Sequence, residues 1–387
     1  MVSTVSIITS RHVPAFSWPA LLARRFGILY TFYMSLLSLF KKPEPSNAFS
    51  FDNGLLRFVS VAHEDGAIHI KRYATEDLAG IVDDRDTIVD EAKFVARLAL
   101  LAKKFEITTA NVVVPDARAI CFHTHVTKAP DRQMTDVIVD HLATYCEANG
   151  LLKLAEYISE YEVILETQFG YDIHATLVPK LYVEHMVRLF KQAGIMVPHI
   201  ETAHHAVARS CVNMPTGTGY IAVSFGKTKT QVSLVNGEHL VAHDRVDVGS
   251  DTIIDTIAKS LRITRAEAER ITERYGVLKA HPDERVLSAI YIALSPIIHT
   301  IDRQLITIGQ IPYKQYGHRF VTRDVLVYGD GAWVKGLIGY LGEETRLHAR
   351  LLDVWVGRSN RAPVQNLPAS DVPKYAEALS LALVYVQ

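Results

Sequence analysis

The segments FDNGLLRFVSV (51–61) and YIAVSFGKTKTQVSLV (220–235) decide the fold that we predict for this chain. Both are rich in Val, Phe and other residues that favour strands. Each is followed by a glycine-containing turn and a second strand-like run, at 67–73 and 238–246. The turn of the second pair is Asn-Gly at 236–237, a strong signal for a β-hairpin. We interpret the two segments as the opening strands of two similar hairpins, which indicates an internal duplication.

The composition is that of a folded protein with room for about two domains. The chain has 387 residues, of which 49% are hydrophobic and 21% charged, and this excludes disordered and fibrous classes. It carries 41 Lys+Arg against 42 Asp+Glu, so it has no basic field to hold a nucleic acid. The cysteines, Cys121, Cys146 and Cys211, are far apart and form no CxxC motif. They predict neither a disulfide framework nor a thiolate metal site, and they fit a reducing, cytoplasmic compartment.

Helix-like and strand-like segments alternate between the two hairpins, a pattern typical of an α/β protein. Apolar residues recur at helical spacing over 86–104, and the run NVVVP (111–115) predicts a buried strand. A compact block follows that looks inserted into the first domain. Its predicted order is strand, helix, strand, strand and helix, over 120–126, 132–148, 157–167, 171–178 and 179–192.

The second half of the chain is predicted to be mostly helical around one further strand. A helix over 251–261 is followed by Thr264 and Glu267, whose spacing is that of a capping box opening the next helix. The remaining predicted elements are a long apolar helix that contains Pro296, a strand, a proline-rich loop and a final helix, over 286–306, 324–328, 361–373 and 374–385.

The first part of the chain, residues 1–45, is interpreted as an N-terminal extension. Its apolar run, 26–40, is flanked by basic residues and is shorter than the ~20 residues of a membrane-spanning helix. Three interpretations stay open: a signal peptide, a helix that lies on a membrane surface, and an untranslated stretch before a true start at Met34. We favour the last of these.

Several short motifs occur in an order that resembles the actin-like ATPase superfamily. The run FDNG (51–54) with Arg57 resembles its first phosphate loop. The order of the motifs is similar to that of the PilM family of type IV pilus assembly, which is related to FtsA, over 46–387. The other matching runs are ETAHHAVAR (201–209) for the connecting helix, AERITERYG (268–276) for a nucleotide-contacting helix and YGDGA (328–332) for the adenosine motif, together with 114–115, 161–164 and 179–180.

The resemblance implies an α/β fold of the actin-like type, in which two domains with duplicated ribonuclease H-like sheets carry an inserted βαββα subdomain. The resemblance also implies how the chain divides into domains. These are the first domain at 46–117, the inserted subdomain at 118–197, a connecting helix and linker at 198–218, the second domain at 219–367 and a C-terminal helix returning to the first domain at 368–387.

In this fold a nucleotide lies between two glycine turns, whose backbone N–H groups donate to the phosphates while acidic side chains hold Mg²⁺ through water. The resemblance therefore implies ATP and Mg²⁺ as cofactors. Glycines in ordinary turns and a solvated charged helix face would account for the same residue types without any ligand. The implied nucleotide-binding residues are Asp52, Gly54, Gly226, Thr228, Thr230, Glu269, Gly329 and Gly331.

Other positions depart from the family pattern. Leu55 and Leu56 stand where small hydroxyl residues are usual, and Ser224 replaces an acidic residue. A serine can neither carry charge for a metal nor accept a proton from water at neutral pH. Thr272 replaces a lysine that contacts ribose, and Asp330 replaces a glycine. We therefore expect the fold without efficient ATP hydrolysis, and no catalytic residue is assigned.

Two histidine pairs raise the question of a metal site. They are His204 with His205 and His123 with His125. Neither pair has a third ligand at a spacing typical of zinc sites, so the sequence predicts no metal.

The leading hypothesis is a cytoplasmic scaffold of type IV pilus biogenesis or related secretion machinery, peripheral to the inner membrane. The resemblance implies that it binds the N-terminal peptide of a PilN-like membrane protein beside the inserted subdomain, within the pilus inner-membrane complex. Self-association stays open, and no nucleic acid partner is expected. One alternative is an active actin-like ATPase or kinase, against which Ser224 argues. Another is an FtsA-like division protein. The last residues given, 376–387, form no basic amphipathic tail, and this argues against that alternative.

Overall fold

The computed structural model describes residues 45–52, 54–64, 66–83, 87–210, 218–236, 239–309, 321–354, 367–368 and 370–386. The expectations for residues 1–44 and for most of the loop at 361–373 lie outside this part of the chain. Within it, no helix combines the length and the apolar character needed to cross a membrane.

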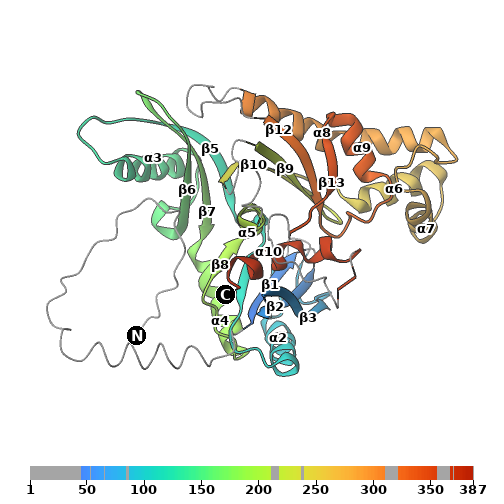
Figure 1. The fold of residues 1–387 in the computed structure, drawn as a ribbon, viewed down its shortest axis with the longest axis horizontal. Coiled ribbons are helices and arrows are strands. Elements are labelled where there is room, and N and C mark those ends of the chain that lie inside the picture. The colour runs from blue at the N-terminus through green and yellow to red at the C-terminus, as the bar shows by residue number, and fades with distance from the viewer. Residues whose placement is uncertain are drawn as a thin grey trace.

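Two five-stranded sheets form the main body, and a three-stranded sheet stands beside them (Figure 1). The first sheet has the order β3-β2-β1-β4-β8, with β1 (Ser46–Asp52), β2 (Leu55–Glu64), β3 (Ala67–Asp77), β4 (Asn111–Val114) and β8 (Ile200–Thr202). The second has the order β11-β10-β9-β12-β13, with β9 (Thr218–Phe225), β10 (Thr230–Asn236), β11 (His239–Val246), β12 (Val321–Tyr328) and β13 (His348–Leu351).

The two five-stranded sheets have the same connectivity. In each, three antiparallel strands come first, and two parallel strands are then added beside the opening strand. This is the duplication that the paired hairpins predicted, and the expected fold class is confirmed.

The sequence prediction was wrong about the opening strands themselves. The runs 51–61 and 220–235 were each taken as one strand, but each contains a turn between two paired strands. Gly54 adopts φ +70° between β1 and β2, a conformation that suits glycine. Between β9 and β10 the N–H of Gly226 donates to the carbonyl of Lys229 at 3.0 Å. Each predicted hairpin is therefore the start of a three-stranded meander.

The inserted block has the predicted βαββα order. It consists of β5 (Ile120–Thr127), α3 (Met134–Ala148), β6 (Tyr157–Glu166), β7 (Gly170–Pro179) and α4 (Lys180–Gln192), with the sheet order β5-β7-β6. The strands alternate in polarity, so the two faces of this sheet differ. Its apolar face packs against α3 through Ile138 and Leu142. The other face, which includes Cys121 and His174, lies towards β11 and towards α5 (Ala203–Ser210).

Helices cover both large sheets and fill the space between them. The aromatic rings of Phe49, Phe94 and Phe190 join the first sheet to α2 (Glu91–Phe105) and α4. The last helix, α10 (Ala376–Val384), is apolar on nearly all sides and lies with α5 between the two sheets. A helix that is apolar on all sides belongs in a core, and α10 is buried accordingly.

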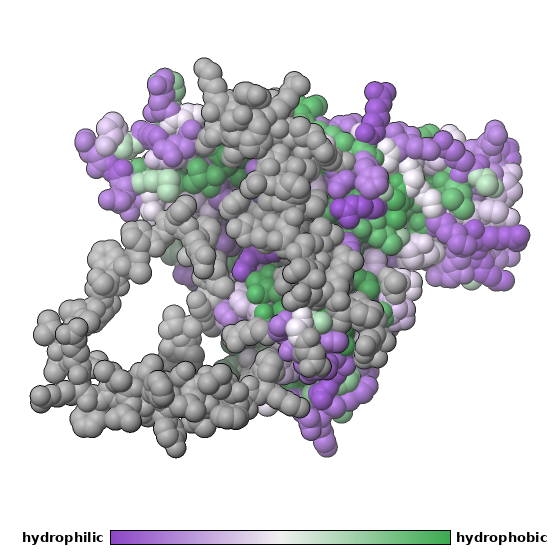
Figure 2. Space-filling model, in the orientation of Figure 1, coloured by the Kyte–Doolittle hydropathy of each residue, from purple (hydrophilic) through white to green (hydrophobic). Residues whose placement is uncertain are grey.

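The second sheet is covered by α6 (Ser250–Leu261), α8 (Glu284–Gly309) and α9 (Leu337–Thr345), with α7 (Arg265–Tyr275) beside them. The capping box predicted for α7 is confirmed, because Thr264 and Glu267 exchange side-chain to backbone hydrogen bonds. Figure 2 shows that the end of the molecule formed by α6 and α7 is mainly hydrophilic.

Candidate functional site

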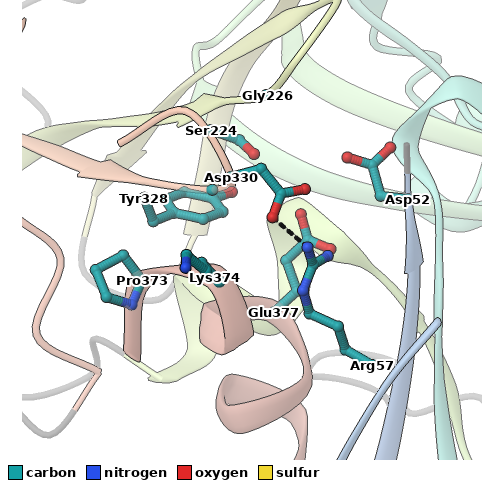
Figure 3. Close-up of a pocket in the computed structure, with 10 residues that line it drawn as sticks. Asp52, Arg57, Ser224, Gly226, Tyr328, Asp330, Pro373, Lys374 and Glu377 are labelled. Carbon is teal, nitrogen blue, oxygen red and sulfur yellow. Dashed lines mark hydrogen bonds and ion pairs between the residues drawn. The ribbon is translucent and has the colours of Figure 1, made fainter. Parts of the chain in front are cut away.

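A small pocket lies where the ends of the two five-stranded sheets meet α10 (Figure 3). Its empty volume is about 260 Å³ and includes space open to solvent. Because part of this volume is open solvent, the space that the protein encloses is smaller than 260 Å³. The lining residues are Asp52, Arg57, Ser224, Gly226, Tyr328, Gly329, Asp330, Pro373, Lys374 and Glu377.

Strand ends place most of the lining side chains. Asp52 is the last residue of β1, and Ser224 is the residue before the end of β9. Tyr328 ends β12, so the chain leaves the sheet there and carries Gly329 and Asp330 into the pocket. Glu377 comes from the first turn of α10. Both duplicated sheets and the C-terminal helix thus contribute to one site.

Two reciprocal ion pairs cross this site. Arg57 of the first sheet pairs with Asp330 in the turn after β12, and the two side chains are only 6% and 9% exposed (Figure 3). Lys229, in the β9–β10 turn, pairs with Asp52 of the first sheet, with Nζ and Oδ1 3.2 Å apart. Arg57 and Lys229 are therefore each neutralised by a carboxylate from the other half of the molecule.

The backbone donors of the glycine turns are also engaged within the protein. The N–H of Gly226 donates to Lys229, that of Gly329 donates to Pro373 at 3.0 Å, and that of Gly331 donates to Phe225 at 2.7 Å. A Cβ added at Gly329, where φ is +98°, would lie 2.8 Å from the carbonyl oxygen of Phe225. Close packing alone therefore requires a glycine here, and these three N–H groups do not fit phosphate binding in this arrangement.

The acidic group of α10 changes the charge of the pocket. Burial, followed by repulsion from Asp52 and Asp116, raises the pKa of Glu377 well above its ordinary value, and Arg57 only partly opposes this. Burial thus favours the neutral form of the Glu377 carboxyl, which adds no charge for a metal. Burial also raises the pKa of the Tyr328 hydroxyl well above its usual value, so this hydroxyl stays protonated.

The structure brings three of the residues implied for nucleotide binding into the pocket, namely Asp52, Gly226 and Gly329. Gly331 packs behind them, where a Cβ would lie 2.5 Å from the ring of Phe225.

The other four implied residues are not among the lining residues. Gly54 lies in the β1–β2 turn, and Thr228 is exposed in the β9–β10 turn. Thr230 is fully buried and donates to the carbonyl of Val248 at 2.6 Å, which is a structural role. Glu269 is exposed on α7. Thr272, expected at the position of a ribose-contacting lysine, is buried and donates to the carbonyl of Ala268.

Sequence reasoning missed several residues of this site. Lys229 follows the glycine turn directly, and its position one residue before β10 was an available signal. Lys374 and Glu377 come from the far end of the chain, and no local pattern connects them with Asp52.

Several solved structures are similar to this chain. The chain is similar to a structure described as the PilM–PilN type IV pilus biogenesis complex, with 15% identity, coverage of 90% of this chain and 100% of that one, and a TM-score of 0.67. Weaker similarity joins it to MreB5 of Spiroplasma citri bound to ADP, with 12% identity, coverage of 81% and 93%, and a TM-score of 0.49. The ethanolamine utilization protein EutJ from Carboxydothermus hydrogenoformans is 14% identical, with coverage of 88% of this chain and 90% of that one and a TM-score of 0.45.

No protein-family model matches the sequence, and no curated protein matches it either. Similarity at this level of identity concerns the fold. The chain has the actin-like fold, with duplicated sheets and an inserted βαββα subdomain, and its fold is similar to that of the PilM–PilN structure.

Proposed function

We propose that this protein is a cytoplasmic scaffold subunit of type IV pilus biogenesis or related secretion machinery, peripheral to the inner membrane. Its partner is the N-terminal peptide of a PilN-like membrane protein. The supporting comparison is the fold similarity to the PilM–PilN complex, which extends over 90% of this chain. We also propose the domain boundaries at 117/118, 197/198 and 218/219, with the C-terminal helix completing the first domain.

The reciprocal ion pairs carry the proposal that the nucleotide site is degenerate. A nucleotide in the pocket would have to separate Arg57 from Asp330 and Lys229 from Asp52. Breaking a buried ion pair by losing one partner costs about 3–5 kcal/mol, because the other charge stays uncompensated. Phosphoryl transfer further requires a held metal and an oriented nucleophile, and Ser224 supplies no charge for either. The pocket therefore serves to join the two sheets rather than to hydrolyse ATP.

We place the peptide-binding surface at the outer side of α4. The inner face of this helix is committed to the core through Val183, Met186 and Phe190. Leu181, in its first turn, is instead 76% exposed. An exposed leucine on an amphipathic helix beside a small sheet suits capture of a short apolar peptide.

Peptide binding tests the proposal directly. A fluorescent peptide with the N-terminal sequence of the PilN-like protein from the same genome should bind the purified full chain saturably. Leu181→Asp should weaken the affinity by roughly tenfold or more, because it places a charge in the apolar contact. The matched control is Ile292→Asp, which changes an equally exposed residue on α8 (71%) and should leave binding unchanged. Absence of binding by the wild type would contradict the scaffold proposal, whereas equal effects of both variants would contradict only the position of the surface.

A further inference from the structure

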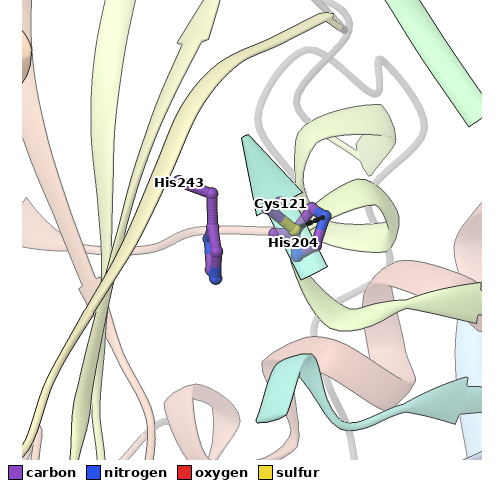
Figure 4. Close-up of side chains that lie close together, drawn as sticks. All are labelled: Cys121, His204 and His243. Carbon is purple, nitrogen blue, oxygen red and sulfur yellow. Dashed lines mark hydrogen bonds between the residues drawn. The ribbon is translucent and has the colours of Figure 1, made fainter. Parts of the chain in front are cut away.

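A second polar region lies away from the pocket, where the inserted sheet meets α5 and β11. Its centre is formed by Cys121 of β5, His204 of α5 and His243 of β11 (Figure 4), and we call these three residues the histidine cluster. One potential ligand atom from each of them lies within 4.8 Å of the others. Three separate parts of the chain thus present one sulfur and two imidazoles to a common point.

The distances are close to those of a metal site. The Sγ of Cys121 lies 3.8 Å from Nε2 of His204, and the rings of His204 and His243 have centroids 4.5 Å apart. Zinc bonds of about 2.3 Å to sulfur and about 2.0 Å to nitrogen, at tetrahedral angles, place sulfur and nitrogen about 3.5 Å apart. The ligand atoms, which lie within 4.8 Å of one another, would have to approach by up to about 1.3 Å to reach this spacing.

Outer partners orient both imidazoles. The Nδ1 of His204 lies 2.7 Å from Oδ1 of the buried Asp116, which leaves Nε2 for the cluster. The Nδ1 of His243 lies 2.8 Å from the hydroxyl of Ser233, which leaves its Nε2 on the side of Asp116, 3.9 Å from Oδ2. Metal-ligating histidines characteristically have their second nitrogen held in this way by a carboxylate or another polar group.

One neighbour competes for His204. The hydroxyl of Thr202 lies 3.1 Å from Nε2 of His204, but it also lies 2.8 Å from Nδ1 of His205. The hydroxyl can therefore donate to His205 when Nε2 of His204 bonds to an ion, so both groups keep a partner.

An unpartnered histidine lies beside the cluster. His174 of β7 is only 2% exposed, and neither of its ring nitrogens has a hydrogen-bond partner. It is on the same face of the inserted sheet as Cys121. Buried polar groups are nearly always satisfied, so such an orphan indicates a missing ligand.

We propose that Cys121, His204 and His243 bind a divalent transition-metal ion, with Zn²⁺ as the ion whose preferences match one thiolate and two imidazoles. The fourth position is taken by a water, for which the buried ring nitrogens of His174 are available partners. Binding replaces the thiol proton of Cys121, which passes to solvent, while both imidazoles bind in their neutral form and nothing is oxidised or reduced. The ion joins the inserted subdomain, the connecting helix and the second sheet.

The decisive experiment is metal loading of the full chain, purified without a histidine tag and stripped with a chelator. Zinc titration with elemental analysis should give about one ion per chain, and Co²⁺ should give the thiolate charge-transfer band and intense d–d bands of a tetrahedral site. Cys121→Ser should remove the charge-transfer band and weaken Zn²⁺ binding by at least about tenfold, and Asp116→Asn should weaken it by about 10–100-fold. Cys146→Ala, which removes the other described cysteine, should change neither.

A second pair of variants provides an independent check. His243→Gln should weaken Zn²⁺ binding, whereas His348→Gln, on the exposed edge strand β13, should leave it unchanged. If the cluster variants fail to fold, X-ray absorption of the zinc-loaded wild type still decides, because it should reveal one sulfur and at least two nitrogen neighbours. A shell of oxygens alone, stoichiometric binding that survives Cys121→Ser and His243→Gln, or no binding at micromolar Zn²⁺ would each overturn the proposal.

Discussion

The pocket and the histidine cluster are both buried, polar and shared between domains, yet they are organised in opposite ways. In the pocket, Arg57 and Lys229 are neutralised by carboxylates from the other half of the molecule. In the cluster, Asp116 and Ser233 hold the Nδ1 atoms of the two imidazoles, and one donor atom from each of the three side chains lies near a common point. Groups of opposite charge close a site by pairing with each other, whereas neutral donors that converge remain available to a cation.

The largest expected effect comes from breaking the buried ion pair of the pocket. Asp330→Ala leaves the guanidinium of Arg57 buried without its counter-charge, which should lower the unfolding free energy by about 3–5 kcal/mol. Replacing both residues, Arg57→Met with Asp330→Leu, should recover most of the loss, because apolar residues of similar volume often match a buried pair in stability. Urea unfolding followed by circular dichroism measures both changes.

An exposed ion pair provides the control for this comparison. Glu343→Ala removes the pair with Lys279, whose Nζ and Oε2 are 2.8 Å apart at the surface, and should change stability by less than about 1 kcal/mol. If Asp330→Ala is as mild as Glu343→Ala, the pocket is not closed by ion pairing and the contrast with the cluster fails.

A smaller, pH-dependent effect is expected beside the cluster, on the same inserted sheet. Burial raises the pKa of Glu160 from 4.5 to about 7, with Glu162 and Glu201 adding repulsion. Between these values the folded protein keeps a proton that the unfolded chain has released, so this group's contribution to stability is complete at acidic pH and is lost as the pH rises to about 7. Glu160→Gln keeps the neutral form and should raise the melting temperature at pH 8 more than at pH 4.5.

The control is Glu156→Gln, which changes an exposed glutamate of the same subdomain. Its melting temperature should differ from that of the wild type by the same small amount at both pH values. A Glu160→Gln difference that does not grow with pH would show that the carboxyl is ionised in the folded protein.

The smallest expected effect concerns catalysis in the pocket. The wild type should release phosphate from Mg²⁺-ATP no faster than Asp52→Ala, and Ser224→Asp alone should not create turnover. One restored charge does not separate the two ion pairs or free the glycine N–H groups, and coupled defects are not repaired singly. Mg²⁺-dependent turnover by the wild type that Asp52→Ala abolishes would show that the pairs open to admit nucleotide, and it would favour the ATPase alternative.

Local patterns in the sequence determined the architecture. The paired strand-like runs, the βαββα order and the capping box of α7 were all readable, because strand alternation, helical spacing and turn residues act between near neighbours in the chain. The turns inside 51–61 and 220–235 were missed, since strand-favouring residues surround a single glycine in each. Gly54 and Gly226 lie in the turns that divide these two runs into the first two strands of each three-stranded meander.

The sequence also identified part of the pocket. Asp52, Gly226 and Gly329 could be predicted because the motifs that contain them resemble those of the actin-like superfamily. Their partners could not, since the pairing of Arg57 with Asp330 and of Lys229 with Asp52 depends on how closely the two sheets approach. Whether such a site is open or closed is decided by those distances rather than by residue type.

The histidine cluster was determined by tertiary structure alone. Sequence reasoning considered His204 with its neighbour and found no third ligand, because zinc motifs are recognised by short spacings. Cys121 and His243 lie on either side of His204 in the chain and reach it only through the packing of β5 and β11 around α5. Residues far apart in sequence meet because burying the apolar sides of three elements brings their polar sides together, and no local pattern encodes that meeting.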